Sequence, residues 1–166
     1  NFGARSLELT RVEVLRGDAD NSQLAGYEGA ELTGMLARPG APAGLSDKRV
    51  IEGGMRAVVF LDITADTRER LPRALIHRLF FISSAASGNA VTVIVEGATA
   101  AVSRDPPLVL GPPLRGDGWV ALSGTSNTSL HRRTIVVVDG KARIAQRFAT
   151  DWTRIGADVL AFRGDP

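Results

Sequence analysis

The chain contains no cysteine, which excludes structural disulfides and zinc sites built on thiolates. Aromatic residues make up only 5% of it, and lysine occurs only at Lys48 and Lys141. The basic residues are therefore nearly all arginines, and they are scattered among acidic residues, so the formal net charge is only +2. A nucleic-acid-binding protein more often has a dense basic stripe with aromatic rings nearby, and we expect no nucleic-acid partner.

Long apolar runs are also missing. The longest are 57–61 and 91–95, far short of the roughly 20 residues that a membrane helix needs, so we expect no membrane span. No signal peptide is visible at Asn1. Hydrophobic residues still make up 44% of the 166 residues, enough for a domain with a core of its own.

The commonest pattern in the sequence is an alternation of apolar and polar residues, which is typical of β-strands. In residues 7–14 the phase of the alternation slips at Thr10–Arg11, which predicts a β-bulge. Residues 55–63 are apolar on both faces, which predicts a strand in the middle of a sheet. Residues 24–38 are predicted as a short helix or an irregular crossing, because three glycines disfavour a longer helix. Further strands are predicted at 74–82 and 90–96, with 97–102 continuing the last or pairing beside it.

Pairs of prolines within 105–107 and 111–113 predict a domain boundary. We therefore expect a β-sandwich accessory domain over 1–105 and a β-rich segment over 106–166. In the second segment, Asp139-Gly140 between two apolar runs predicts a two-residue β-hairpin. The predicted fold class is all-β and mainly antiparallel: an immunoglobulin-like β-sandwich plus a C-terminal β-hairpin segment.

Few residues of the sequence are candidates for catalysis or metal binding. Of the two histidines, His77 lies in an alternating strand and is predicted to be satisfied by one hydrogen bond, whereas His131 follows a polar loop, a more plausible functional position. The residue types of a Ser-His-Asp triad are present around His131: Ser123, Ser126 or Ser129 with Asp139 or Asp151. No nucleophile-elbow pattern supports such a triad. The residues also offer no obvious set of three zinc ligands. We therefore assign no catalytic residue to this chain.

A resemblance appears in the last third of the chain. The segments Gly-Pro-Pro-Leu-Arg-Gly-Asp-Gly-Trp-Val-Ala (111–121), Ser-Asn-Thr-Ser-Leu-His-Arg-Arg (126–133), Val-Asp-Gly (138–140) and Arg-Ile-Ala-Gln-Arg-Phe-Ala-Thr-Asp-Trp (143–152) follow one another in order. They resemble the segment that leads into the catalytic domain of bacterial lysostaphin/LytM-type zinc metallopeptidases, in a divergent subgroup with a β-rich N-terminal domain. The resemblance implies a peptidoglycan endopeptidase whose zinc is held by His, Asp and His.

The resemblance places Asp151 at the position of the zinc-binding Asp. Arg147 stands where that family has its first His, and arginine does not ligate zinc. The later His-x-His pair does not occur in this sequence. Asp151 is therefore a candidate zinc ligand in a longer parent chain, His131 is a speculative substitute for the missing His, and the chain itself needs no cofactor.

The preferred hypothesis is therefore an N-terminal accessory domain of a bacterial cell-envelope zinc metallopeptidase-like protein, periplasmic or secreted, that is not catalytic by itself. Its expected partners are its own C-terminal peptidase domain or peptidoglycan. The alternative is a stand-alone β-sandwich module that binds a protein or a cell-wall glycan. A hydrolase complete in itself is disfavoured. Asn127, Arg132 and Arg133 are the candidate binding residues, because they are polar and lie around a loop.

Overall fold

The structure is a computed structural model. It describes residues 1–18, 20–42, 44–64, 71–84, 89–106, 108–124 and 126–156. The chain divides into two compact units, Asn1–Asp105 and Pro106–Pro166. Within the second predicted segment, residues 107, 125 and 157–166 lie outside the described residues. The fold is mostly antiparallel β-sheet with few helices, so the predicted all-β class is confirmed.

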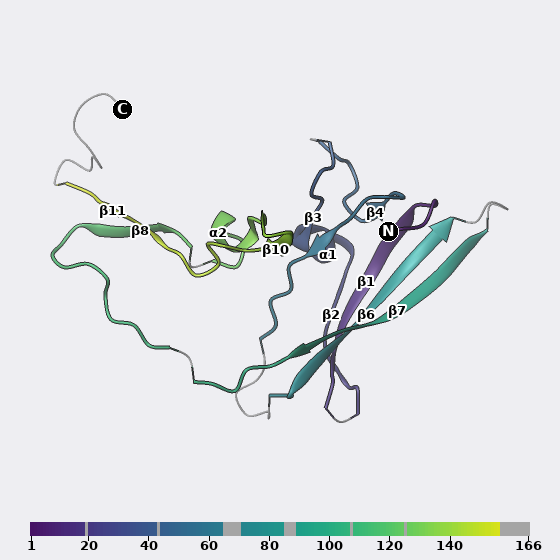
Figure 1. Ribbon diagram of the computed structural model, residues 1–166, viewed down its shortest axis with the longest axis horizontal. Helices are drawn as coiled ribbons and strands as arrows, with labels where there is room; N and C mark the ends of the chain where they lie inside the picture. Colours follow the sequence, from purple (N-terminus) through teal and green to yellow (C-terminus); the bar gives the residue numbers. More distant parts are fainter. Residues whose placement is uncertain are drawn as a thin grey trace. The chain divides into compact units, whose positions relative to one another are not determined.

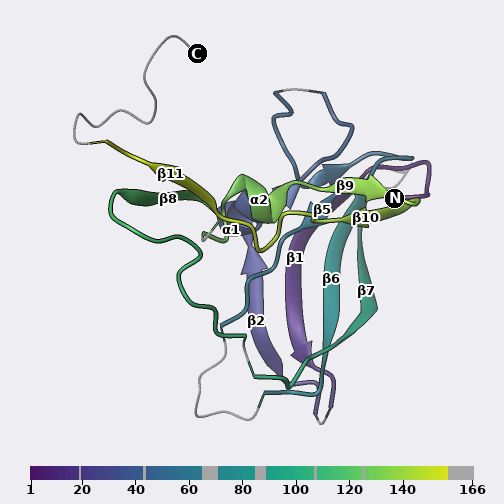
Figure 2. The ribbon, with the colours of Figure 1, turned by 60° about the vertical axis from the view of Figure 1, so that its left-hand side comes forward.

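The first unit is built on one antiparallel sheet with the strand order β2-β1-β6-β7, and β4 also pairs with β1 (Figure 1). The long central strand β1 lies between β2 and β6, and β7 forms the edge beyond β6 (Figure 2). The strands of this sheet are β1 (Leu7–Arg16), β2 (Gln23–Glu28), β4 (Val50–Ile51), β6 (Ala74–Ser84) and β7 (Ala90–Ala101). The predicted strands at 7–14, 74–82 and 90–96 are therefore confirmed, and β7 continues the last of them through the 97–102 stretch as far as Ala101.

The predicted bulge is present in β1. Its register against β6 shifts between Leu9, opposite Phe81, and Arg11, opposite Phe80, which leaves Thr10 as the extra residue. The Thr10 hydroxyl donates to the Phe80 carbonyl. Because of the shift, Leu9 and Val12 both reach the core although an odd number of steps separates them.

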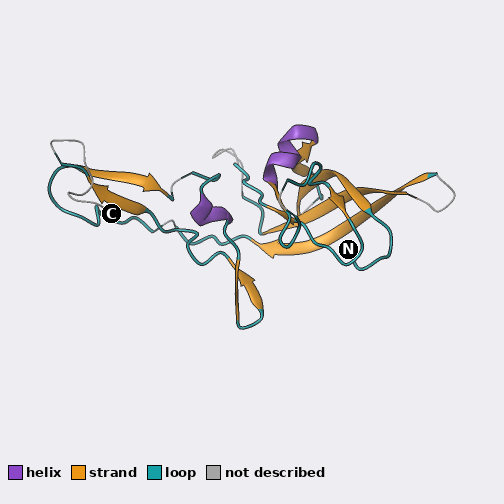
Figure 3. Ribbon diagram, turned by 90° about the horizontal axis from the view of Figure 1, so that it is seen from above, coloured by secondary structure: helices purple, strands orange, loops and turns teal. Residues whose placement is uncertain are grey.

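One face of the sheet carries the core of the unit. Its fully buried side chains include Val12 and Val14 of β1 and Leu32 of the helix α1 (Gly29–Met35), which lies against this face (Figure 3). The ambiguous region 24–38 thus contains β2, α1 and the first strand of a small separate sheet. Partly buried apolar residues of 57–63 pack against the same core: Ala57, Val59, Leu61 and Ile63.

The prediction that 55–63 is a central sheet strand is wrong. Only Val58–Val59 is a strand, β5, and it pairs with β3 (Leu36–Ala37) in a two-stranded sheet. Both sides of β1 are already occupied by other strands, so this segment covers the core with its side chains and does not enter the main sheet. Its apolar residues are needed for that contact, which is why the pattern resembles a buried strand.

The other face of the sheet carries a ladder of charges across four strands. Arg11 pairs with Glu28 and Glu13, and Arg78 bridges Glu13 and Glu96. Hydrogen bonding to the Glu96 carboxylate, helped by the nearby Glu13, raises the pKa of Arg78. Glu13, between the two arginines, is itself buried, with 7% of the residue exposed, so the ladder pairs a buried carboxylate. The immunoglobulin-like sandwich stays a prediction.

The second unit consists of two separate two-stranded sheets and one helical turn. Strand β8 (Trp119–Ser123) pairs with β11 (Asp151–Arg154), β9 (Val136–Val138) pairs with β10 (Lys141–Arg143), and α2 spans Leu130–Arg133. Asp139 and Gly140 have φ of 50° and 71° between β9 and β10, as a type I′ turn requires, which confirms the hairpin. In the parts of the chain that the structure describes, no helix is long and apolar enough to cross a membrane.

Candidate functional site

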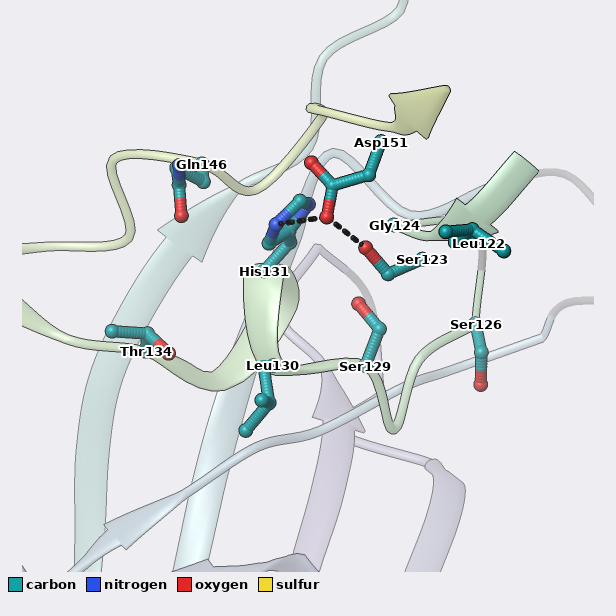
Figure 4. Close-up of a pocket in the computed structure, with 10 residues that line it drawn as sticks. All are labelled: Leu122, Ser123, Gly124, Ser126, Ser129, Leu130, His131, Thr134, Gln146 and Asp151. Carbon is teal, nitrogen blue, oxygen red and sulfur yellow. Dashed lines mark hydrogen bonds and ion pairs between the residues drawn. The ribbon is translucent and has the colours of Figure 1, made fainter. Parts of the chain in front are cut away.

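An open pocket of about 510 Å³ lies in the second unit. It is formed by the end of β8, the loop that follows, α2 and the start of β11 (Figure 4). Its lining is rich in hydroxyl groups and also includes two leucines, one histidine and one carboxylate. His131 and Asp151, both predicted as metal-ligand candidates, therefore line the same pocket.

These two side chains contact each other directly. The Nε2 atom of His131 lies 3.2 Å from Oδ2 of Asp151, although they are far apart in the sequence. His131 is largely buried, with 12% of its side chain exposed, whereas the Asp151 side chain is 60% exposed. The helical turn α2 supplies the histidine and the first residue of β11 supplies the carboxylate.

The hydrogen bond on the other side of the imidazole fixes what Nε2 can do. Nδ1 of His131 lies 3.1 Å from the Ala149 carbonyl, which can only accept a hydrogen bond, so Nδ1 carries a proton. In a neutral His131 the lone pair of Nε2 then points toward a carboxylate oxygen, so two hydrogen-bond acceptors face each other. A cation bound between them, or a second proton on the ring, removes this repulsion. Histidines that bind metals usually donate their other N–H to a backbone carbonyl or a carboxylate in this way. The pair therefore has the geometry of an imidazolium–carboxylate ion pair and equally that of two ligands of one metal ion.

Ser123 holds the carboxylate in place. Its hydroxyl donates to Oδ2 of Asp151 over 2.5 Å, so the same oxygen contacts both Ser123 and His131. Figure 4 shows the three side chains converging on this oxygen. A hydrogen bond that orients a ligating carboxylate is a common second layer around metal sites.

The backbone at Gly124 brings these groups together. Gly124 is buried with φ of 104°, and a Cβ there would lie only 1.9 Å from the Ala149 carbonyl oxygen. That carbonyl is the acceptor for His131. Only glycine permits this approach of the two chain segments, which sets Ser123 beside Asp151 and Ala149 beside the imidazole.

The geometry does not match a serine-protease triad. In a triad the serine hydroxyl bonds to the imidazole, and the carboxylate lies on the far side of the ring. Here Ser123 bonds to Asp151, and the far side of the His131 ring faces a backbone carbonyl. Ser123, His131 and Asp151 therefore meet, but in an order that does not activate a hydroxyl nucleophile.

The predicted binding residues form the support of the loop before α2. Arg132 donates to Oδ1 of Asn127 over 2.9 Å and to the Gly124 carbonyl over 3.4 Å, and Arg133 donates to the Asn127 carbonyl. Asn127, Arg132 and Arg133 thus bond to one another and to the loop backbone, beside the pocket and not among its lining residues.

No protein family, curated protein or solved structure matches this chain. Among the described residues, no group of three or more His, Asp or Glu side chains is placed to hold a metal. Arg147 lies over the Phe148 ring at 5.7 Å and is not among the residues that line the pocket.

The remaining histidine has a different environment. Nδ1 of His77 lies 2.9 Å from the Ala98 carbonyl in the first unit, as expected for a histidine satisfied by one hydrogen bond. Sequence reasoning found His131 and Asp151 but not the supporting roles of Gly124 and Ala149. A glycine and a backbone carbonyl carry no chemical signal in a sequence, so only the structure identifies them.

Proposed function

We propose that this chain is the accessory domain and adjoining ligand-bearing segment of a cell-envelope zinc metallopeptidase-like protein. Residues 1–105 serve as the accessory domain, and 106–166 contributes zinc ligands. The observation that carries the proposal is the pairing of His131 Nε2 with Asp151 Oδ2 while Nδ1 donates to the Ala149 carbonyl. The resemblance of 111–152 to that family agrees with it in placing a ligand at Asp151.

His131 and Asp151 would hold the metal, and Ser123 would orient the carboxylate. A catalytic zinc usually has three protein ligands, lowers the pKa of a bound water to near 7 and polarises the substrate carbonyl. Two ligands do not complete such a centre, so the proposal requires further donors from outside the described residues. By itself the chain is expected to bind zinc weakly and to cleave nothing.

The buried Ser129 hydroxyl supports a ligand in this pocket. Its Oγ is buried and has no hydrogen-bond partner among the described residues, although it lines the pocket beside Ser126 and Leu130. An unpaired buried hydroxyl is costly, and a polar group or water of a bound ligand would satisfy it. The pocket thus offers a polar anchor near the proposed metal ligands.

Metal binding by the intact chain tests this proposal. Isothermal titration with Zn²⁺, and the visible absorption of Co²⁺, should show one site that is lost in His131→Ala and in Asp151→Ala. His77→Ala is the matched control, because it removes the other histidine and should leave binding unchanged. Binding of Zn²⁺ by His131→Ala equal to that of the wild-type chain would refute the ligand assignment.

The complete gene gives a second test. A His-x-His pair encoded downstream, together with zinc-dependent release of peptides from peptidoglycan by the full product, would support the peptidase assignment. A complete product without that pair would exclude the catalytic version and favour the alternative, a β-sandwich module that binds a protein or cell-wall glycan. The first unit has its own buried core, which suits that alternative. Binding of purified cell-wall fragments by the chain would then decide it.

A further inference from the structure

The most exposed long element of the first unit is the edge strand β7. It hydrogen-bonds to β6 on one side, and no strand pairs with its other side within the described residues. All of its residues are exposed except Gly97. Val91, Val93, Ile94 and Val95 are between 36% and 56% exposed, which is unusual for a run of β-branched residues.

This edge lacks the usual protection against pairing. Natural edge strands are commonly short, or carry lysine, proline or a bulge that blocks a further strand. The stretch 90–96 contains none of these, and its single charge, Glu96, is engaged by Arg78 of the neighbouring strand. The irregularity in β7 comes only after this stretch, where Ala98 has φ of 52° and the register against β6 shifts. Residues 90–96 therefore form a regular strand edge on which a further strand can pair, with their one charge, Glu96, at the C-terminal end.

The side chains of this stretch are sorted by face. Val91, Val93 and Val95 lie opposite Ser83, Phe81 and Leu79, on the face that carries the core. Thr92 and Ile94 lie on the other face, with Ile82 and Phe80. A strand added to the edge would extend both sets of contacts and satisfy the outward backbone groups of β7.

We infer that β7 pairs antiparallel with β7 of a second copy of this chain, about a twofold axis at Val93. This register uses the whole of 90–96: Val93 faces its own copy, Val91 faces Val95, and Thr92 faces Ile94. Valine then faces valine along one whole face. Glu96 faces Ala90, so the two Glu96 carboxylates lie at opposite ends of the pairing, roughly 20 Å apart at ~3.4 Å per residue. In this register the edge therefore pairs with itself without bringing like charges together.

The absence of cysteine makes the pairing directly testable. In Val93→Cys the two thiols would lie opposite each other, with Cα atoms about 4.5–5.5 Å apart, within reach of a disulfide. Mild oxidation of the intact chain should then give a covalent dimer. Ala90→Cys is the matched control on the same strand and should give little, because its copy would lie roughly 20 Å away at ~3.4 Å per residue. Equal cross-linking of the two variants would overturn the proposal.

A charge exchange tests the register in solution. The wild-type chain should show a concentration-dependent dimer by light scattering after size-exclusion chromatography. Val91→Lys and Val95→Glu should each weaken it by about tenfold, whereas the double variant, in which each introduced lysine faces an introduced glutamate of the other copy, should restore it. Thermal unfolding of each variant shows whether the fold is kept. A monomer at every concentration, or a double variant weaker than both single ones, would overturn the proposal and leave the edge to a strand of another protein.

Discussion

At the scale of single residues, the His131–Asp151 pair is held in place by groups that are not proposed as metal ligands. Ser123 fixes one oxygen of Asp151, the Ala149 carbonyl fixes the imidazole of His131, and Gly124 allows the two segments to approach. Each of these roles is one of orientation, and loss of such orienting contacts commonly changes metal affinity by about 10- to 100-fold.

Ser123→Ala is therefore expected to lower the affinity of the chain for Zn²⁺ by about tenfold, because the Asp151 carboxylate loses its orienting hydrogen bond. Ser123→Thr keeps the hydroxyl and should keep most of the affinity. Ser126→Ala, which removes a hydroxyl bonded to Thr128, is the control. Unchanged zinc affinity and Co²⁺ absorption in Ser123→Ala would show that the serine has no orienting role.

A second prediction at the residue scale concerns Asp47 in the first unit and the dependence of stability on pH. Hydrogen bonds from the backbone N–H and then from the side chain of Arg49 lower the pKa of the Asp47 carboxyl. Because the folded pKa is lower than the unfolded one, the stabilisation is present above the unfolded pKa and is lost as pH falls through the folded pKa.

Asp47→Asn should therefore melt below the wild-type chain at pH 7, and the difference should shrink as the pH falls from the unfolded pKa, about 3.9, through the lower folded pKa. Circular dichroism melts of both chains from neutral pH down to about pH 2.5 measure this. A melting-temperature difference that stays constant over that range would contradict the assignment.

At the scale of elements, the short helix α1 covers part of the core, as do residues 57–63. A seven-residue helix has little stability of its own and depends on packing of its apolar side. Leu32 is its one buried residue, with no exposed area, and it belongs to the same core cluster as Val12, Val14 and Tyr27. The helix is therefore held against the core by buried Leu32 and by Met35, which is partly buried and packs against the same cluster.

Leu32→Ala should lower the free energy of unfolding by about 2–5 kcal/mol, as is typical when a buried leucine leaves a cavity. Glu31→Ala, at an exposed neighbouring position, should change it by less than about 0.5 kcal/mol. Urea unfolding followed by circular dichroism gives both values. A loss of similar size in both variants would mean that α1 does not anchor the core through Leu32.

At the scale of the whole molecule, the two units differ in how they are stabilised. All buried hydrophobic side chains of the described chain belong to the first unit, whereas Gly124 is the one buried residue among those described in the second. Isolated two-stranded sheets are only marginally stable in water. The first unit should therefore behave as a cooperative domain and the second as a weakly protected one.

Hydrogen exchange of the intact chain should show slow amides in β1 and β6 and fast amides in β8 to β11. Added Zn²⁺ should slow exchange around α2 and β11 only, because binding stabilises the state that binds. His131→Ala should abolish that zinc effect and leave the first unit unchanged. Equal protection of both units in the absence of metal would refute this division.

Local patterns in the sequence determined the all-β class, the strands at 74–82 and 90–96, the bulge at Thr10 and the turn at Asp139–Gly140. Alternation, β-branching and turn chemistry act between neighbours along the chain, so these features need no tertiary information. The sequence also pointed to Asp151 and His131 as residues of interest. The residue types alone did not show that the two would meet.

The tertiary structure decided the rest. It placed 57–63 over the core and outside the main sheet. A segment with apolar residues on both faces has the same sequence pattern whether it is a central strand or packs over a core, so the sequence does not distinguish the two. Among the described strands it gave β7 a partner on one side only, since strand order is set by pairing between distant segments. It also joined His131, Asp151 and Ser123, because the close approach at Gly124 brings together segments that are far apart in the chain.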